Sequence, residues 1–458
     1  MLAIRSRKIC QGRAGDAHNA WNCWTVGRSS LNDHGKLIEL ERPPVIETAV
    51  LVRLVLPSDG EDEVQESLDE MRRLAWTAGA EVACTIVQRR PKPCPATLIG
   101  KGKLEEVRAA CEEVEADVVL ADSDLTPAQG AKLEAVLGVK VVDRTQLILD
   151  IFAQHAHTNE GKHQVELAQL DYILPRLAGR GAVMRQKGGI GLRGPGEQKL
   201  EEDRRVIRRR IDRLRADIEA IRKQRRIQRK RRKESAARGV ALVGYTNAGK
   251  SSLLNALTGA DVLVEDKLFA TLDPRARRCK LPSQREVVFS DTVGFIRKLP
   301  HGLVAAFRAT LEEVNDADLI LLVADAAHPA TEDHVNAVYE VLREIDAFDK
   351  PVLNVFNKID IADPGRVREL DRALGHGVGV SALTGEGIED LAQAVDAQLA
   401  GQSSRVMLRI PQSKAGLVAR LHQVGRVLEE SYEDNAILVN VELDHAIESQ
   451  FREFIACR

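Results

Sequence analysis

The sequence lacks any long apolar run. No stretch of its 458 residues approaches the roughly 18 apolar residues that a membrane helix needs. Its first residues also lack the apolar segment of a secretory signal. These absences exclude a membrane-spanning protein and predict a soluble, cytoplasmic one.

Closely spaced cysteine pairs are missing too, so no zinc-binding or disulfide framework is predicted. The seven cysteines are Cys10, Cys23, Cys84, Cys94, Cys111, Cys279 and Cys457. We expect them to be reduced thiols of a cytosolic protein.

The formal net charge of −2 conceals one strongly basic segment. Residues 204–233 are dense in arginine and lysine, and acidic stretches elsewhere offset them. Within this segment, the outer face of residues 222–233 is either a solvated surface or a surface for nucleic acid, and its density of positive charge with little compensating acid favours nucleic acid.

A phosphate-binding loop is the first motif that is present. Residues 244–251 read Gly-Tyr-Thr-Asn-Ala-Gly-Lys-Ser, after the apolar run 240–243 and before a helical run at 252–257. In this strand, loop and helix context, the glycines let N–H groups turn toward phosphate oxygens. Lys250 is then expected to reach the β and γ phosphates, and the Ser251 hydroxyl to bind Mg²⁺.

A second motif predicts which base the bound nucleotide carries. Residues 357–360 read Asn-Lys-Ile-Asp and close a predicted strand at 351–356. The Asp360 carboxylate can accept two hydrogen bonds from guanine, whereas adenine offers neither donor. We expect Lys358 to cover one face of the base, Asn357 to brace the loop, and residues 381–383 to present N–H groups to the guanine O6. An isolated motif of this kind is often an ordinary turn, but after a phosphate loop it predicts GTP and GDP as ligands.

Two further loops are predicted to respond to the γ phosphate. Thr271 is placed to bind Mg²⁺ and touch this phosphate, Asp291 to hold Mg²⁺ through water, and the Gly294 N–H to sense the phosphate. We predict Lys250, Thr271 and Gly294 as catalytic, and Ser251 and Thr271 as metal ligands. The predicted nucleotide-binding residues are Gly244, Tyr245, Thr246, Asn247, Ala248, Gly249, Lys250, Ser251, Phe269, Ala270, Thr271, Leu272, Asp273, Asp291, Thr292, Val293, Gly294, Asn357, Lys358, Ile359, Asp360, Ser381, Ala382 and Leu383.

Phe295 follows Gly294, at the position where many GTPases carry a water-orienting glutamine. An apolar ring cannot orient water, so we predict slow intrinsic hydrolysis that a partner or a bound cation accelerates. Asn247 is a candidate ligand for K⁺; alternatively it only braces the loop.

The alternation of apolar strands and amphipathic helices predicts an α/β protein of several domains. A P-loop GTPase domain at 238–400 is preceded by a small parallel α/β domain at 46–160 and an antiparallel helical hairpin at 161–237. A small α/β domain at 405–458 follows, and its last helix is expected to start at Ala446. Residues 1–45 are expected to form a disordered extension.

The hairpin follows from two helical runs, 163–177 and about 197–234, with apolar residues at three- and four-residue steps. Their seam is expected to include Val165, Leu167, Leu170, Ile173 and Leu174, which face a set in the second helix: Leu200, Ile207, Ile211, Leu214, Ile218 and Ile221. The glycine-rich connection is either a flexible linker or a basic probe for RNA. The stiff hairpin behind it favours RNA contacts through Arg180, Arg185, Lys187 and Arg193.

The motifs together resemble those of the HflX-type GTPases, a family associated with translation. The matching segments are residues 165–170, 194–197, 200–201, 244–251, 269–273 and 291–296, and the resemblance spans residue 46 to the C-terminus. It implies a GTP hydrolase that binds the large ribosomal subunit in a GTP-dependent way, with the hairpin tip near the peptidyl transferase centre. It further implies that the protein rescues or splits stalled ribosomes or assists subunit assembly. We expect a monomer.

The chain departs from the family pattern at two places. Gln198 and Lys199 replace a Thr-Gln pair, and Leu383 stands where lysine is common. Two other functions remain open: a tRNA-modification GTPase, which would need a cofactor site that the sequence does not display, and an RNA-binding assembly chaperone whose hydrolysis times release.

Overall fold

The computed structural model describes most of the chain from residue 46 onward. The described residues are 30–31, 37–38, 46–184, 195–233, 238–259, 268–269, 271, 275–297, 313–401, 403–433, 435–444 and 448–455. Residues 1–47 form one unit and residues 48–458 another. Within 1–45, two short strands pair antiparallel, β1 (Ser30–Leu31) with β2 (Leu37–Ile38); the rest of the predicted extension lies outside the described residues.

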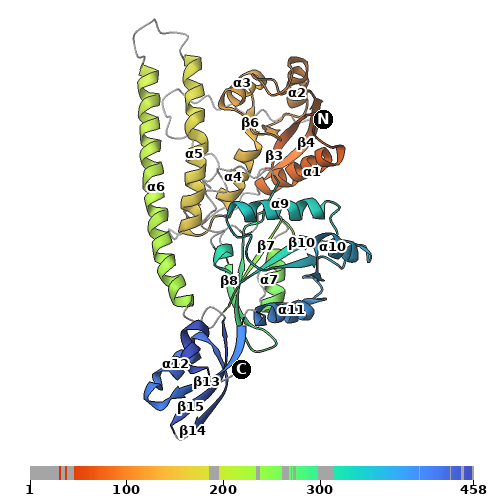
Figure 1. Ribbon diagram of the computed structural model, residues 1–458. Coiled ribbons are helices and arrows are strands. Elements are labelled where there is room, and N and C mark those ends of the chain that lie inside the picture. Colours follow the sequence, from red (N-terminus) through yellow and green to blue (C-terminus); the bar gives the residue numbers. More distant parts are fainter. Residues whose placement is uncertain are drawn as a thin grey trace. The chain divides into compact units, whose positions relative to one another are not determined.

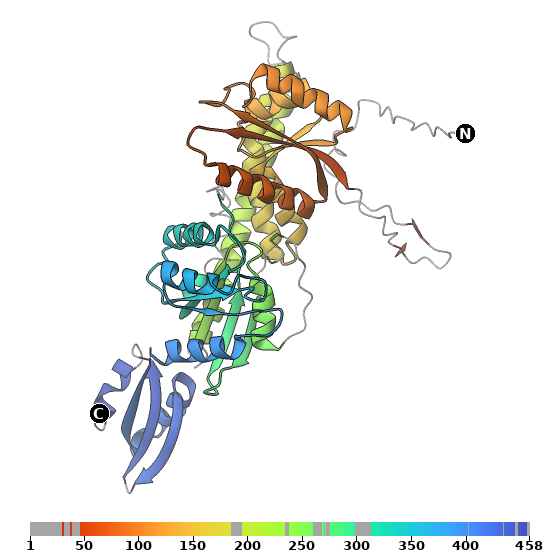
Figure 2. The ribbon, with the colours of Figure 1, turned by 90° about the vertical axis from the view of Figure 1, so that its right-hand side faces the viewer.

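The first domain of the larger unit is built on a four-stranded sheet of order β4-β3-β5-β6. Its elements are β3 (Glu47–Val55), α1 (Glu61–Ala78), β4 (Ala80–Arg89), α2 (Lys101–Glu113), β5 (Val118–Ala121), α3 (Pro127–Leu137), β6 (Lys140–Asp143) and α4 (Arg144–His155). β3, β5 and β6 are parallel. Residues 49–52 of β3 are almost fully buried because helices cover both faces of the sheet, α1 and α4 one face and α2 and α3 the other (Figure 2).

The helical hairpin consists of α5 (Asn159–Met184) and α6 (Pro195–Lys233), which lie side by side (Figure 1). Of the predicted seam, Val165, Ile211, Leu214 and Ile218 are buried. Arg210 also donates two 2.7 Å hydrogen bonds to the Glu166 carboxylate across the hairpin. Such a two-bond geometry favours this register of the helices. Both helices extend beyond the predicted bounds at their N-terminal ends.

The GTPase-like domain has a six-stranded sheet of order β12-β11-β10-β7-β9-β8. Its strands are β7 (Arg238–Gly244), β8 (Arg275–Lys280), β9 (Glu286–Asp291), β10 (Leu319–Asp325), β11 (Val352–Asn357) and β12 (Gly377–Gly379). All neighbours are parallel except β8 with β9. Helices α7 (Lys250–Thr258) and α11 (Ile388–Ala400) pack on one face, and α9 (Thr331–Glu344) and α10 (Arg366–Leu374) on the other.

This topology brings the functional loops together. Parallel strands end at the same edge of a sheet, where open α/β sheets bind their ligands. Gly244, Asp291 and Asn357 end β7, β9 and β11, three strands of this one sheet. The predicted motifs therefore meet at one edge although more than a hundred residues separate the first from the last.

The C-terminal domain is an antiparallel sheet of order β13-β15-β14. Its elements are β13 (Ser403–Pro411), η2 (Gln412–Lys414), α12 (Gly416–Val424), β14 (Arg426–Glu433), β15 (Ala436–Asp444) and η3 (Ser449–Phe454). The predicted last helix corresponds to the 3-10 helix η3, and its predicted start at Ala446 lies outside the described residues. Phe451 and Phe454 of η3 are buried in the core of the domain, so packing and not helix propensity decides this segment.

The predicted fold class is confirmed in its architecture: a parallel α/β domain, a helical hairpin, a second α/β domain with the predicted phosphate loop after β7, and a C-terminal domain with an antiparallel sheet. Among the residues that the structure describes, no helix is both long and apolar enough to cross a membrane.

Candidate functional site

The loop between β7 and α7 is shaped by glycines that no larger residue could replace. A Cβ on Gly244 would lie 2.2 Å from the Val323 carbonyl oxygen. Gly249 has a φ of +87°, and a Cβ there would lie 2.2 Å from Nδ2 of Asn357. Asn247 also has a left-handed backbone, with a φ of +62°, a conformation that asparagine tolerates better than most residues. The main chain therefore wraps tightly at the edge of the sheet.

Lys250 lies across this loop. Its Nζ donates hydrogen bonds to the carbonyl oxygens of Gly244 at 3.1 Å and Tyr245 at 2.8 Å. Burial lowers the pKa of Lys250 to about 8, although the negative charge of Asp291 acts in the opposite direction. An incoming phosphate would give this amine a charged partner in place of two neutral carbonyls.

Three oxygen-bearing side chains converge beside Lys250. The Ser251 Oγ lies 2.8 Å from Oγ1 of Thr271 and donates a 2.6 Å hydrogen bond to Oδ2 of Asp291. Asp291 is fully buried, and its Oδ1 has no hydrogen-bond partner among the described residues. Two hydroxyls beside a buried carboxylate with an unsatisfied oxygen fit Mg²⁺, which prefers oxygen ligands and retains part of its water shell.

Gly294 is packed against the phosphate loop. A Cβ at this position would lie 2.9 Å from the Thr246 Cα and 3.0 Å from Nζ of Lys250. Main-chain hydrogen bonds run from Thr246 N to Phe295 O at 2.7 Å and from Phe295 N to Gly244 O at 3.1 Å. The Phe295 ring is buried in the core of the domain, so it does not reach a bound phosphate.

Asn357 joins the base-reading motif to the phosphate loop. Its Nδ2 donates to the Ala248 carbonyl oxygen at 2.8 Å, and its Oδ1 accepts from the Ala382 N–H at 3.0 Å. Lys358 has a φ of +67° and pairs with Asp325 at 2.6 Å. Asp360 is exposed and lines the same cavity as Lys250, so its carboxylate is accessible to a ligand.

The predicted use of residues 381–383 meets a constraint. The Ser381 N–H donates to the Glu386 carbonyl oxygen at 2.9 Å, and the Ala382 N–H is bonded to Asn357. A base oxygen would have to share or displace these bonds, so the role stays a prediction. Leu383 is 87% exposed and would offer the base an apolar surface.

One open cavity of about 480 Å³ collects most of the predicted residues. Its lining includes Thr246, Asn247, Gly249, Lys250, Ser251, Phe269, Thr271, Thr292, Gly294, Asn357, Lys358, Asp360, Ala382 and Leu383. The sequence had not singled out Ser252 and Ile361, which also line it. The other described residues of the predicted set, such as Gly244 and Asp291, do not line it. Ala270, Leu272 and Asp273 lie outside the described residues.

A contact with the first domain was missed at the sequence level. The Tyr245 hydroxyl donates to Oε1 of Glu70 at 2.5 Å and accepts from the Arg297 N–H at 2.8 Å. Phe269 packs edge-on against Phe152, with ring centroids 4.6 Å apart. No sequence motif links these partners, because Glu70 and Tyr245 are 175 residues apart.

The predicted RNA contacts remain predictions. Arg185, Lys187 and Arg193 lie outside the described residues. Arg180 belongs to α5, but its side chain is outside the described part.

Four family models together match nearly the whole chain after residue 64. They are described as "GTP-binding GTPase N-terminal" at residues 65–153, "GTP-binding GTPase Middle Region" at 155–232, "50S ribosome-binding GTPase" at 239–358 and "HflX C-terminal domain" at 367–453.

Full-length relatives are similar over most of their length. A protein of Caldanaerobacter subterraneus subsp. tengcongensis named GTPase HflX is 48% identical over 89% of this chain and 94% of its own. One from Escherichia coli K12 with the same name is 45% identical over 85% of this chain and 91% of its own. A solved structure, SsGBP with GDP, is 28% identical, covers 78% of this chain and 99% of its own, and has a TM-score of 0.46.

The lowered pKa of Lys250 predicts proton uptake when nucleotide binds. Without nucleotide, a pKa of about 8 leaves the amine partly neutral above pH 7, and a bound phosphate should restore the charged form. Uptake should therefore be small at pH 7, rise to roughly half a proton per nucleotide at pH 8, and increase further toward pH 9. Calorimetric titrations of Mg–GDP in buffers of different ionisation enthalpy would measure it. Uptake that stays constant from pH 7 to 9 would contradict a neutral Lys250.

Proposed function

Because the chain belongs to the HflX family of GTPases, we propose that it binds the large ribosomal subunit in a GTP-dependent way and rescues or splits stalled ribosomes or assists subunit assembly. Family membership makes it a GTP hydrolase. The proposal concerns its partner, its residues and its mechanism.

The observation that carries the nucleotide part is the placement of Asn357. One amide bonds both the phosphate loop, through Ala248, and the loop that carries Ala382. This holds the exposed Asp360 in the cavity that Lys250 also lines. A carboxylate that accepts two hydrogen bonds from guanine would be left unpaired by adenine, and such a loss is worth several kcal/mol.

The hydrolytic groups act by position and charge. Lys250 would exchange its carbonyl partners for β and γ phosphate oxygens, and main-chain N–H groups of the loop would bind the same oxygens. Ser251 and Thr271 would hold Mg²⁺, with Asp291 behind them; Mg²⁺ supplies charge that stabilises the phosphate oxygens during transfer. The Gly294 N–H would sense the γ phosphate by donating a hydrogen bond to it.

Hydrolysis alone should be slow, because Phe295 is buried in the core of the domain and cannot orient the attacking water. A partner could supply the missing group, and a family model described as "50S ribosome-binding GTPase" matches this domain. Exposed arginines on α6 support an RNA partner: Arg205, Arg208, Arg209, Arg213 and Arg215. A tRNA-modification GTPase and an assembly chaperone stay alternatives, and ribosome-stimulated turnover distinguishes the first of them.

Replacing Asp360 tests the reading of the base. Asp360→Asn should weaken GTP binding by roughly two to four orders of magnitude, because two hydrogen bonds to a charged acceptor are worth about 3–6 kcal/mol. Binding of xanthosine triphosphate should improve, since the new amide can donate to the oxygen that replaces the guanine amine. Asp363→Asn, an exposed aspartate in the same loop, is the matched control. Unchanged preference for guanine in Asp360→Asn would refute the assignment.

Asn247 is tested by changing the monovalent cation. If its amide oxygen binds K⁺ beside the phosphates, turnover should be about tenfold or more faster in K⁺ than in Na⁺. Asn247→Gly keeps the left-handed backbone but removes the oxygen, so it should lose this difference, whereas Asn247→Asp should keep it. Equal rates in both salts for the unmodified protein would leave Asn247 with a bracing role only.

Steady-state GTP turnover with and without purified large ribosomal subunits tests the partner. Subunits should raise turnover at least tenfold, by analogy with GTPase partners that supply missing groups, and their affinity should fall steeply with salt. Replacing residues 185–194 by a short Gly-Ser linker should preserve basal turnover and reduce the stimulation. If the intact chain neither bound large subunits nor was stimulated by them, the ribosome proposal would be overturned. If the linker variant were stimulated fully, the hairpin tip would not be needed for stimulation.

A further inference from the structure

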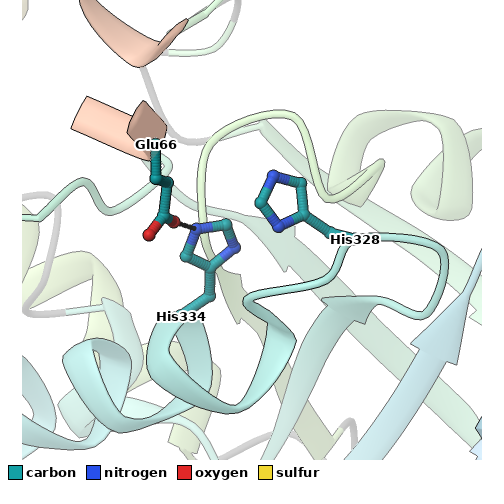
Figure 3. A group of neighbouring side chains, drawn as sticks. All are labelled: Glu66, His328 and His334. Carbon is teal, nitrogen blue, oxygen red and sulfur yellow. Dashed lines mark hydrogen bonds and ion pairs between the residues drawn. The ribbon is translucent and has the colours of Figure 1, made fainter. Parts of the chain in front are cut away.

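Three potential metal ligands converge outside the nucleotide cavity (Figure 3). Glu66 comes from α1, His328 from the segment after β10, and His334 from the first part of α9. One ligand atom from each lies within 4.8 Å of the others. Residues from two domains, more than 260 positions apart, are therefore brought to a single point.

A small cavity lies at this point. Glu66, His328 and His334 all line it, together with Tyr245 and Asp325, and its volume is about 30 Å³. This exceeds the roughly 10–15 Å³ that one water molecule requires. The space is sufficient for one ion, and the polar groups that face it include the three potential ligands.

The two histidines are suited to donate lone pairs. Both rings are half-buried, and Nδ1 of His328 accepts a hydrogen bond from the Ala330 N–H, so this nitrogen carries a lone pair. Neutral imidazole is the form that binds metal ions. Glu66 supplies a negative charge: its Oε1 lies 2.7 Å from Nε2 of His334, while its Oε2 is held by Arg297 at 2.7 Å. The carboxylate is thus already fixed beside the ring.

We propose that Glu66, His328 and His334 form a binding site for a transition-metal ion of the Zn²⁺ type, distinct from the Mg²⁺ site. Two imidazoles and one carboxylate match Zn²⁺, whereas Mg²⁺ prefers oxygen ligands alone. Water in the cavity would complete a tetrahedral shell. This proposal rests on the cluster and does not depend on the proposed ribosome function.

Binding requires local side-chain movement and a change of tautomer at His334, because Nε2 carries the proton in its hydrogen bond to Glu66 and the proton must move to Nδ1 before Nε2 can bind the ion. At metal bond lengths of about 2.0–2.1 Å, ligand atoms in a tetrahedral shell lie about 3.3 Å apart, so the 2.7 Å contact between Glu66 and His334 must open slightly. The Ala330 N–H lies 3.2 Å from Nδ1 of His328, and the ion would compete with this long hydrogen bond for the same lone pair. The side chain of Arg297 can stay on Oε2 of Glu66 throughout.

An ion here would connect α1 to the nucleotide-binding domain directly beside the phosphate loop. The ring of His334 stacks on that of Tyr245, with centroids 3.7 Å apart and planes 6° apart. An ion that binds only the folded protein also stabilises it, by an amount that grows with the logarithm of its free concentration relative to its Kd. Zn²⁺ should therefore raise the melting temperature of the Mg–GDP-loaded protein, and this rise should require all three ligands.

The test is a competition titration of Zn²⁺ with a chromophoric chelator, using the full chain loaded with Mg–GDP so that the nucleotide site is occupied. The intact protein should bind one Zn²⁺ ion. The variants Glu66→Gln, His328→Gln and His334→Gln should each bind Zn²⁺ at least about a hundredfold more weakly. Loss of even an outer partner of a metal ligand lowers metal affinity about 10- to 100-fold, and each of these variants loses a ligand itself. His376→Gln, whose side chain is fully exposed, is the control. GDP affinity and circular dichroism would verify that each variant folds.

X-ray absorption of the Zn²⁺-loaded intact protein gives a readout that needs no variant. It should show imidazole and oxygen neighbours at about 2.0–2.2 Å. Sulfur neighbours would place the ion on cysteines and overturn the proposal, as would the absence of Zn²⁺ binding to the intact protein. Equal Zn²⁺ affinity in the three folded variants would overturn it as well, and leave the cluster as a polar contact between domains.

Discussion

The nucleotide site depends on the side chain of one buried residue, Asn357. Its amide donates to Ala248 and accepts from Ala382. It therefore fixes the distance between the predicted phosphate loop and the predicted base-reading loops that carry Asn357 and Ala382. The packing around Asn357 also requires glycine at position 249, because a Cβ there would overlap Nδ2 of Asn357. Losing this amide would leave the buried carbonyl oxygen of Ala248 unpaired, at a cost of about 1–3 kcal/mol, and would also remove the partner of the partly buried Ala382 N–H.

The phosphate loop is supported from the first domain as well. Glu70 of α1 accepts from Tyr245 and pairs with the buried Arg144, which also pairs with Asp122. Burial and the charge of Glu70 raise the pKa of Tyr245 well above its ordinary value, so its hydroxyl stays a donor. A buried ion pair contributes little net stability, but removing one partner leaves an uncompensated charge. This arrangement therefore fixes where α1 meets the loop more than it stabilises the fold.

The sequence predicted those features of the fold and the site that depend on residues close together in the sequence. The strands ending at Gly244 and Asn357 follow from continuous apolar runs, and the order of parallel strands then brings Lys250 and Asp360 to one edge. The packing of Phe269 on Phe152 and the bond from Tyr245 to Glu70 could not be predicted, because each joins residues of different domains with no shared motif. The same holds for His334, which in the sequence is one polar residue at the start of an amphipathic helix.

These contacts bear on how hydrolysis can be controlled. Lys250 is bonded to carbonyl oxygens of its own loop, and Phe295 is joined to that loop by two main-chain hydrogen bonds. Gly294, where a Cβ would lie too close to Thr246, lets residues 291–297 lie directly on the phosphate loop. Arg297, three residues after Gly294, pairs with Glu63 and Glu66 of α1. Residues 291–297 are therefore bonded both to the phosphate loop and to α1, so a displacement of this segment would act on both.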